Sequence, residues 1–468
     1  MADTLLVFNG IDAATGSYLV PPLAPAEVAR VALGEKLDPE HFRQLRWRNE
    51  QRVQKSLGLK AGIDPGQLSQ AGWGVMFAHD GDPAVRAALA PLLQHRCTQA
   101  GERYREFAGA DGYRPREQSW DFLRRYKHAP AGPVDPERVP YYLLIVGEPE
   151  EIPYRFQYLL DAQFAVGRIA FGTPEEYAQY AQSVVHAESG GLSKPARAAF
   201  FGVRNADDQA TEMSADQLVA PLADWFAQGH PDWSVDRVFA AEATTQRLGD
   251  LLGEAATPRF LFSASHGIGF PCGHALQYAH QGALLCQDWP GPLQHRGAIP
   301  QDFYFTGEDV SDTADVSGMV AFFFACFSGG TPRLDDFSHA AFTDPQPIAP
   351  RAFVAALPKR LLAHPKGGAA VVARVERAWG YSLSWPGAGP QWQAFESTLT
   401  QLMAGSPIGS ALEYFNDRYA QLAAVLATQI EDAKFQKQTD ELELAGTWTA
   451  HNDARSYVIV GDPAVRLG

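Results

Sequence analysis

Two residues whose side chains can do nucleophilic chemistry follow apolar stretches of the sequence. His266 comes just after the run Phe260–Ala264, and Cys326 ends the apolar run that begins at Met319. A thiol becomes a useful nucleophile at neutral pH when a base or a cation lies beside it, and an imidazole can serve as either. Gly267 leaves room for a substrate carbonyl, and its N–H is a candidate oxyanion donor. Cys326 and His266 therefore predict a catalytic dyad.

Taken singly, these signals have simpler explanations. A cysteine at the end of an apolar strand is most often an inert core residue, and a histidine before glycine is most often a turn residue. Their joint occurrence at two expected strand ends favours the dyad. A competing group, Cys272, His274, His280 and Cys286, has the residue types of a zinc site, but its spacing is not one of the common patterns. We therefore expect no metal.

The elements that must position the dyad are short apolar strands that alternate with helical patterns. Most of these strands are continuous apolar runs, which is typical of strands buried on both faces of a parallel sheet. In an open parallel sheet, ligands bind outside the carboxyl ends of the strands, so neighbouring strands would bring His266 and Cys326 to one edge. The expected strands are Thr4–Phe8, Trp73–Phe77, Tyr141–Val146, Ala198–Val203, Phe260–Ala264, Met319–Ala325, Ala369–Ala373 and Tyr457–Val460.

The sequence predicts an α/β fold of two adjacent α/β subdomains. A turn-rich stretch, Gly190–Pro195, marks the expected boundary. It separates an N-terminal α/β subdomain of unclear role, residues 1–192, from a C-terminal domain, residues 193–468, that carries both dyad residues. Near the C-terminus, apolar residues recur every three or four positions from Ile408 to Ile430, which predicts a long amphipathic helix packed on the sheet.

Composition limits the partners of the protein. The 468 residues include 54 Asp+Glu against 39 Lys+Arg, a net charge of −15 that argues against nucleic acid or an anionic membrane surface as the main partner. The continuous apolar run from Met319 to Phe327, within the uncharged stretch between Asp315 and Arg333, is too short to span a membrane. The first residues lack the features of a signal peptide, and four cysteines make no disulfide framework, so we expect a cytoplasmic protein.

No phosphate-binding loop of the GxxxxGK[ST] type is present, and we expect no cofactor.

Two short motifs resemble those of the caspase–gingipain group of cysteine peptidases, clan CD. Ser265-His266-Gly267 is similar to the His-Gly motif of that group, and Ala325-Cys326 is similar to its Ala-Cys motif, in the same order along the chain. The wider context resembles the gingipain-like (C25) branch and its CHAT-domain relatives, through the segments Tyr142–Pro153 and Tyr457–Leu467 and over roughly residues 140–468 in all.

This resemblance implies a caspase-like catalytic domain, with a mostly parallel sheet flanked by helices, and an endopeptidase mechanism. Cys326 would attack the scissile carbonyl, and His266 would protonate the leaving amine. In relatives that prefer basic residues, an acidic group follows the first strand of the catalytic subdomain. Asp207 and Asp208 stand at that place here, and either could receive a substrate Arg or Lys; the alternative is that both are solvated carboxylates of a loop.

Two other sets of residues bear on specificity. Asp335 and Asp336, after the expected nucleophile, form a second acidic pair that could bind a basic side chain. If Arg204 lined the pocket instead, acidic substrates would be preferred, as in caspases.

The leading interpretation is a cytoplasmic cysteine endopeptidase that cuts protein substrates after Arg or Lys. An intracellular peptidase needs restraint, so we expect a regulatory or activating protein partner or proteolytic activation, with the loop of about residues 268–315 as control element and Arg296-Gly297 as a cut site. The resemblance also implies a bacterial context of stress or antiviral defence. The alternative is a catalytically silent, caspase-like scaffold that binds proteins; it would not need Cys326 and His266 to share a pocket open to solvent.

Overall fold

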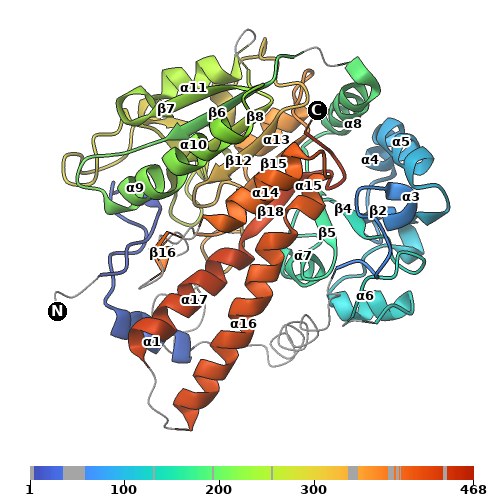
Figure 1. Ribbon diagram of the computed structural model, residues 1–468, viewed down its shortest axis with the longest axis horizontal. Coiled ribbons are helices and arrows are strands. Elements are labelled where there is room, and N and C mark those ends of the chain that lie inside the picture. The colour runs from blue at the N-terminus through green and yellow to red at the C-terminus, as the bar shows by residue number, and fades with distance from the viewer. Residues whose placement is uncertain are drawn as a thin grey trace.

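Ten strands form one continuous sheet at the centre of the computed structural model (Figure 1), in the order β3-β2-β4-β5-β18-β15-β12-β8-β6-β7. Their bounds are β2 Trp73–Phe77, β3 Tyr104–Phe107, β4 Tyr142–Val146, β5 Ala165–Ile169, β6 Arg197–Gly202, β7 Ser234–Phe239, β8 Phe260–Ala264, β12 Val320–Phe324, β15 Ala370–Arg374 and β18 Tyr457–Gly461. The structure describes residues 5–34, 58–129, 132–191, 194–253, 257–335, 346–377, 384–385, 389–390, 392–435 and 440–467.

The sheet consists of two groups of five parallel strands. All neighbouring pairs are parallel except β15 and β18, which are antiparallel. The carboxyl ends of β15, β12, β8, β6 and β7 therefore lie at the opposite edge from those of the other five strands. The prediction of an α/β fold with a mostly parallel sheet flanked by helices is confirmed. The proposed domain boundary near residue 192 stays a prediction, and the pairing of β5 with β18 carries the sheet from one half to the other.

Helices flank the sheet and connect its strands (Figure 1). Their bounds are α1 Pro25–Gly34, α3 Leu68–Ala71, α4 Pro83–Ala88, α5 Ala90–Ala100, α6 Ser119–Arg125, α7 Tyr154–Asp161, α8 Pro174–His186, α9 Gln209–Ser214, α10 Ala220–Gly229, α11 Thr245–Leu252, α12 Gln277–His280, α13 Ala356–Ala363, α14 Gln393–Met403, α15 Ile408–Ala411, α16 Glu413–Lys434 and α17 Glu441–Arg455. No helix among the described residues is long and apolar enough to cross a membrane.

The predicted amphipathic helix is confirmed as α15 and α16, which follow one another with only Leu412 between them. Its first part packs on the sheet, because the Phe415 ring lies 4.5 Å from the Tyr457 ring and 6.0 Å from the Phe322 ring, measured between centroids. Its second part leaves the sheet and pairs with α17, as Figure 1 shows. There Leu426 and Ile430 are buried against α17 and α1 rather than against strands.

One predicted strand is wrong. In the described part of Thr4–Phe8, Leu6 and Phe8 are isolated bridge residues rather than members of a strand, with Leu6 bridged to Leu23 in the antiparallel sense. Leu6 and Phe8 are instead buried against α1, α16 and α17. These residues are apolar because they are buried in this separate cluster. A short apolar run shows that a segment is buried, but it does not show whether the segment lies in a sheet.

Four shorter strands form a second sheet next to the carboxyl end of β8. They are β1 Ile11–Asp12, β9 His266–Gly269, β10 Leu284–Leu285 and β11 Tyr304–Phe305, in the order β1-β9-β10-β11. The remaining short strands are β13 Gly330–Thr331, β14 Phe353–Val354, β16 Ser384–Trp385 and β17 Gly389–Pro390. Because β1 is paired with β9, a segment from the start of the chain reaches the place where His266 begins β9.

Candidate active site

The sheet register brings His266 and Cys326 to the same edge. Strands β8 and β12 are adjacent and parallel, with Ala264 opposite Phe324 at their carboxyl ends. His266 lies two residues after Ala264, and Cys326 lies two residues after Phe324. Equal offsets from two neighbouring strand ends explain how residues 60 positions apart in sequence share one site.

The chain turns sharply after each strand. Phe327, directly after Cys326, has a φ of +58°, a left-handed conformation that is uncommon for a bulky residue, and its N–H donates to the Glu376 carbonyl at 2.7 Å. Gly267 packs so closely on Cys326 that an added Cβ would clash with the Cys326 carbonyl. This close approach requires glycine at position 267. Its predicted role as oxyanion donor stays a prediction.

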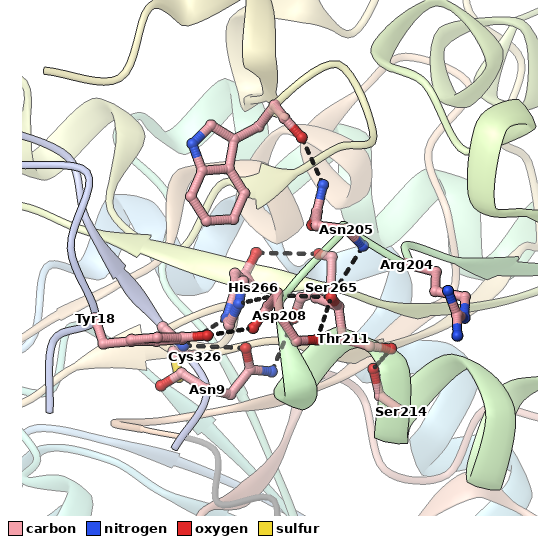
Figure 2. A network of polar contacts seen from close by, with 12 residues as sticks. Asn9, Tyr18, Arg204, Asn205, Asp208, Thr211, Ser214, Ser265, His266 and Cys326 are labelled. Carbon is pink, nitrogen blue, oxygen red and sulfur yellow. Dashed lines mark hydrogen bonds and ion pairs between the residues drawn. The ribbon is translucent and has the colours of Figure 1, made fainter. Parts of the chain in front are cut away.

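The two ring nitrogens of His266 have different partners. Nδ1 accepts the Gly10 N–H at 2.8 Å, and Nε2 lies 2.7 Å from Oδ2 of Asp208 (Figure 2). Because a backbone amide can only donate, Nδ1 is unprotonated in this arrangement and Nε2 carries the proton towards the carboxylate. The Tyr18 and Trp289 rings approach the imidazole edge-on, each at 5.9 Å between centroids.

Asp208 accepts hydrogen bonds from three side chains. Besides His266, the Tyr18 hydroxyl donates to Oδ1 and the Thr211 hydroxyl donates to Oδ2, both at 2.6 Å. Burial alone would raise the pKa of Asp208, but the electrostatic interaction and hydrogen bond with His266, together with the hydrogen bonds from the two hydroxyls, lower that pKa to about 2. The residue is thus a carboxylate throughout the neutral range, and it orients the imidazole.

Cys326 contacts the same peptide unit as His266. Its Sγ donates to the Asn9 carbonyl at 3.0 Å. The buried guanidinium groups of Arg374 and Arg377 also interact electrostatically with Cys326, but each is already ion-paired, Arg374 with Asp453 and Arg377 with Asp335 and Glu376.

The chain's own N-terminal segment covers both dyad residues. Cys326 and His266 are 0% exposed. Asn9 and Gly10 lie directly on them, and Leu19 packs on Cys326. Figure 2 shows Asn9 and Tyr18 approaching His266 from the same side as Cys326. Cys326 and His266 therefore contact one peptide unit and are closed to solvent, and entry of a substrate requires this segment to move.

The predicted substrate-binding carboxylates lie in different surroundings. Asp207 is exposed on a turn with a φ of +58°, and Asp336 lies outside the described residues. Asp208 is engaged by His266, a geometry that corrects its predicted role in receiving a substrate cation. Asp335 is buried and forms an ion pair with Arg377 at 2.8 Å.

The surroundings of Arg204 and of the four candidate zinc ligands do not support the roles considered for them. Arg204 is exposed and pairs with Asp216 and Glu212, away from the dyad. The candidate zinc ligands do not gather: within the described ranges, no three His, Cys, Asp or Glu side chains are close enough together to hold a metal ion. Of these four, Cys272 is exposed and His280 hydrogen-bonds with the Tyr304 hydroxyl.

The expected control loop lies beside the N-terminal segment. Ile268, Leu285 and Trp289 of the loop pack with Ile11 and Ala13 in one apolar cluster. Gly297, whose N–H donates to the Thr15 carbonyl, is exposed, as is Arg296. The loop thus contacts the segment that covers the dyad, and a cut at Arg296-Gly297 stays a prediction.

Sequence reasoning missed the contribution of Asn9, Gly10 and Tyr18. Nothing in their local pattern identifies them, since the site lies more than 250 residues further along the chain. The position of Asp208 gave a usable signal: it follows β6, which neighbours β8 in the sheet. A carboxylate after the strand next to the histidine strand is a natural partner for that histidine.

The chain is similar to known proteins over most of its length. The profile of Peptidase family C25 matches residues 84–468. Among solved structures, one titled "Structure of Protease" superimposes with a TM-score of 0.50 and 13% identity, covering 85% of this chain and 78% of its own. The Arg-specific cysteine proteinase gingipain R gives a TM-score of 0.49 at 12% identity, with the same coverage. A complex of the Porphyromonas gingivalis RgpB pro- and mature domains gives 0.44 at 12% identity, covering 84% and 79%. No curated protein matches.

Proposed function

Because the chain belongs to peptidase family C25 and is therefore a cysteine peptidase, we propose that Cys326 is its nucleophile and His266 its proton-transfer group. Asp208 acts as the positioning residue that fixes the imidazole with Nδ1 towards the reacting atoms. The resemblance seen in the sequence and the surroundings of the three side chains support the same assignment.

One observation carries the proposal. The peptide unit between Asn9 and Gly10 touches both dyad residues, with its carbonyl oxygen 3.0 Å from Cys326 Sγ and its N–H 2.8 Å from His266 Nδ1. Peptide cleavage needs a nucleophile at the carbonyl and a proton source at the nitrogen of one amide. The site presents these two groups to the two ends of a peptide unit.

The mechanism follows from these positions. Cys326 Sγ attacks the scissile carbonyl carbon, and His266 Nδ1 takes the thiol proton and delivers it to the departing nitrogen. Asp208 stabilises the imidazolium that forms between these transfers. Water then hydrolyses the thioester, and Gly267 N–H is the proposed donor to the oxyanion.

Substrate and control are further parts of the proposal. A protein substrate would enter after the covering segment moves, and a regulatory partner or a proteolytic cut would cause that movement, acting in the cytoplasm. A preference for Arg or Lys before the scissile bond remains the expectation from family resemblance. Among the carboxylates predicted for this role, Asp335 could bind a basic side chain only after its ion pair with Arg377 opens.

Cleavage of an unfolded protein tests the function. Reduced casein is incubated with the wild type, Cys326→Ala and His266→Ala, and with Cys272→Ala as a matched control at an exposed cysteine. We expect cutting by the wild type and the control only, with the cut sites mapped by mass spectrometry. To remove the cover, the series is repeated with Phe8→Ala, which weakens the anchor of the segment. Equal cutting by Cys326→Ala would refute the assignment.

A further inference from the structure

The Asn9–Gly10 peptide unit lies in the site as a substrate would. Cys326 Sγ lies 3.0 Å from the Asn9 carbonyl oxygen, which is one bond from the carbon that the thiol would attack. The nitrogen that would leave, that of Gly10, is 2.8 Å from the unprotonated His266 Nδ1. Both contacts are hydrogen bonds to the two ends of one peptide unit, so they place that unit against both side chains.

The side chain of Asn9 is held by the site. Its Nδ2 donates to the Ser265 carbonyl at 2.9 Å, and Asn9 is 3% exposed. Ser265 directly precedes His266, so the residue before the reacting bond is recognised by the backbone that carries the histidine. A carboxamide donor fits this carbonyl, whereas a carboxylate of the same shape would be repelled by it.

Gly10 fits the other side of the bond for a steric reason. Its φ of +106° is a conformation that favours glycine. An added Cβ would lie 2.8 Å from Leu19 Cδ1 and 3.0 Å from Cys326 Sγ. The unit therefore combines a recognised asparagine with a glycine that lets the backbone approach the thiol.

The segment is firmly attached on both sides of this unit. Leu6 and Phe8 are buried with α1, α16 and α17 before it, and Ile11 is paired with Ile268 after it. Attachment on both sides holds the bond across the dyad. The segment also lies outside residues 84–468, the range that matches the family, so it is a feature of this chain in addition to the family domain.

We infer that this peptidase cuts its own Asn9–Gly10 bond, and that asparagine is an accepted residue before its scissile bond. The inference rests on the proposed function. Cys326 Sγ forms a thioester with the Asn9 carbonyl as the C–N bond breaks, and the thiol proton passes through His266 Nδ1 to the Gly10 nitrogen. Water hydrolyses the thioester, leaving a carboxylate on Asn9, a new α-amine on Gly10 and a free thiol. Cleavage breaks the covalent link between the two attached flanks over the dyad.

The test is the identity of the N-terminus over time. The full chain is incubated with a thiol reductant between pH 5 and 9, and its intact mass and N-terminal sequence are followed. We expect Gly10 to become the first residue in the wild type and the bond to stay intact in Cys326→Ala. Spontaneous breakdown at Asn-Gly would continue in Cys326→Ala, so cleavage there overturns the inference.

Variants of the cut residue sharpen the result. Asn9→Asp should slow cleavage at least tenfold, while the matched change Asn416→Asp on α16 should leave the rate within twofold of the wild type. Peptides with Asn-Gly should be cut in trans faster than their Asp-Gly counterparts. Equal rates for Asn9→Asp and the wild type, or for the two peptides, would contradict recognition of asparagine.

A separate readout distinguishes this inference from the proposed function. An intact N-terminus in the wild type overturns self-cleavage. If Phe8→Ala then cuts casein in a Cys326-dependent way, the proposed function stands and the segment is only an inhibitor. If Phe8→Ala cuts neither casein nor its own chain, both the inference and the proposed function fail.

Discussion

Replacing Asp208 with Asn tests whether its carboxylate supports the imidazole. The substitution keeps the shape of the side chain and removes its charge. The pKa of Asp208 falls from its ordinary 3.8 to about 2, which corresponds to about 2 kcal/mol of net stabilisation of the carboxylate. Burial raises the pKa of Asp208, so the contacts that stabilise the carboxylate must together outweigh the cost of burying it and leave this net stabilisation. His266 is one of three donors, and we assign its charged contact about 2 kcal/mol, within the range for hydrogen bonds to charged groups.

This energy predicts a loss of about 30-fold in the rate of acylation, because every 1.36 kcal/mol corresponds to about tenfold in rate. The assay is the second-order rate of labelling of Cys326 by a peptidyl chloromethylketone. Both proteins carry Phe8→Ala, so that access to the site is matched even though Asp208 also holds Tyr18 of the covering segment. Asp207→Asn, at the exposed neighbour, is the control and should label at the parent rate. An unchanged rate for a folded Asp208→Asn variant would refute the positioning role.

The remaining predictions concern stability. The lowered pKa of Asp208 stabilises the fold above about pH 4, and this contribution of about 2 kcal/mol is lost as the pH falls towards 2. The free energy of unfolding, measured with urea, should therefore fall more between pH 4 and pH 2 for the wild type than for Asp208→Asn. Gly267→Ala should lower the free energy of unfolding by about 2 kcal/mol or more because its Cβ meets a backbone carbonyl, whereas Gly229→Ala, with open space around it, should cost under about 0.5 kcal/mol by the same measurement. Arg377→Met removes a buried cation from Asp335 and should cost about 3 kcal/mol, and the double variant with Asp335→Leu should recover part of that loss in thermal unfolding; no recovery would contradict the pairing.

Much of the sheet could be predicted because its strands are buried on both faces. Trp73–Phe77 and Phe260–Ala264 are strands with the predicted bounds, since continuous apolar runs are strong signals. The edge strand β7 was missed because Ser234, Asp236 and Arg237 break its apolar pattern, as an exposed edge allows. The reversal of strand direction between β15 and β18 depends on pairing between distant segments, which local patterns do not encode.

The candidate site also contains residues that could be predicted from the sequence and residues that could not. Cys326 and His266 could be predicted from their own residue types and from the strands that precede them, and their catalytic role stays a prediction. Asp208 was found with a different role, because its partner depends on the order of β6, β8 and β12 in the sheet. The cover over Cys326 could not be predicted. Asn9 and Gly10 are placed there by the burial of the preceding Leu6 and Phe8 against α1, α16 and α17, which no local pattern indicates.

The measurement that tests the central claim most directly is the site of covalent labelling. Matched peptidyl-asparagine and peptidyl-arginine chloromethylketones are added to the Phe8→Ala protein, and labelled peptides are identified by mass spectrometry. The account predicts an adduct on Cys326 that forms much more slowly when His266 is replaced with Ala, and comparison of the two probes shows which side chain the site prefers. Labelling confined to the exposed Cys272, with Cys326 unmodified by either probe, would contradict the assignment of Cys326 as the nucleophile.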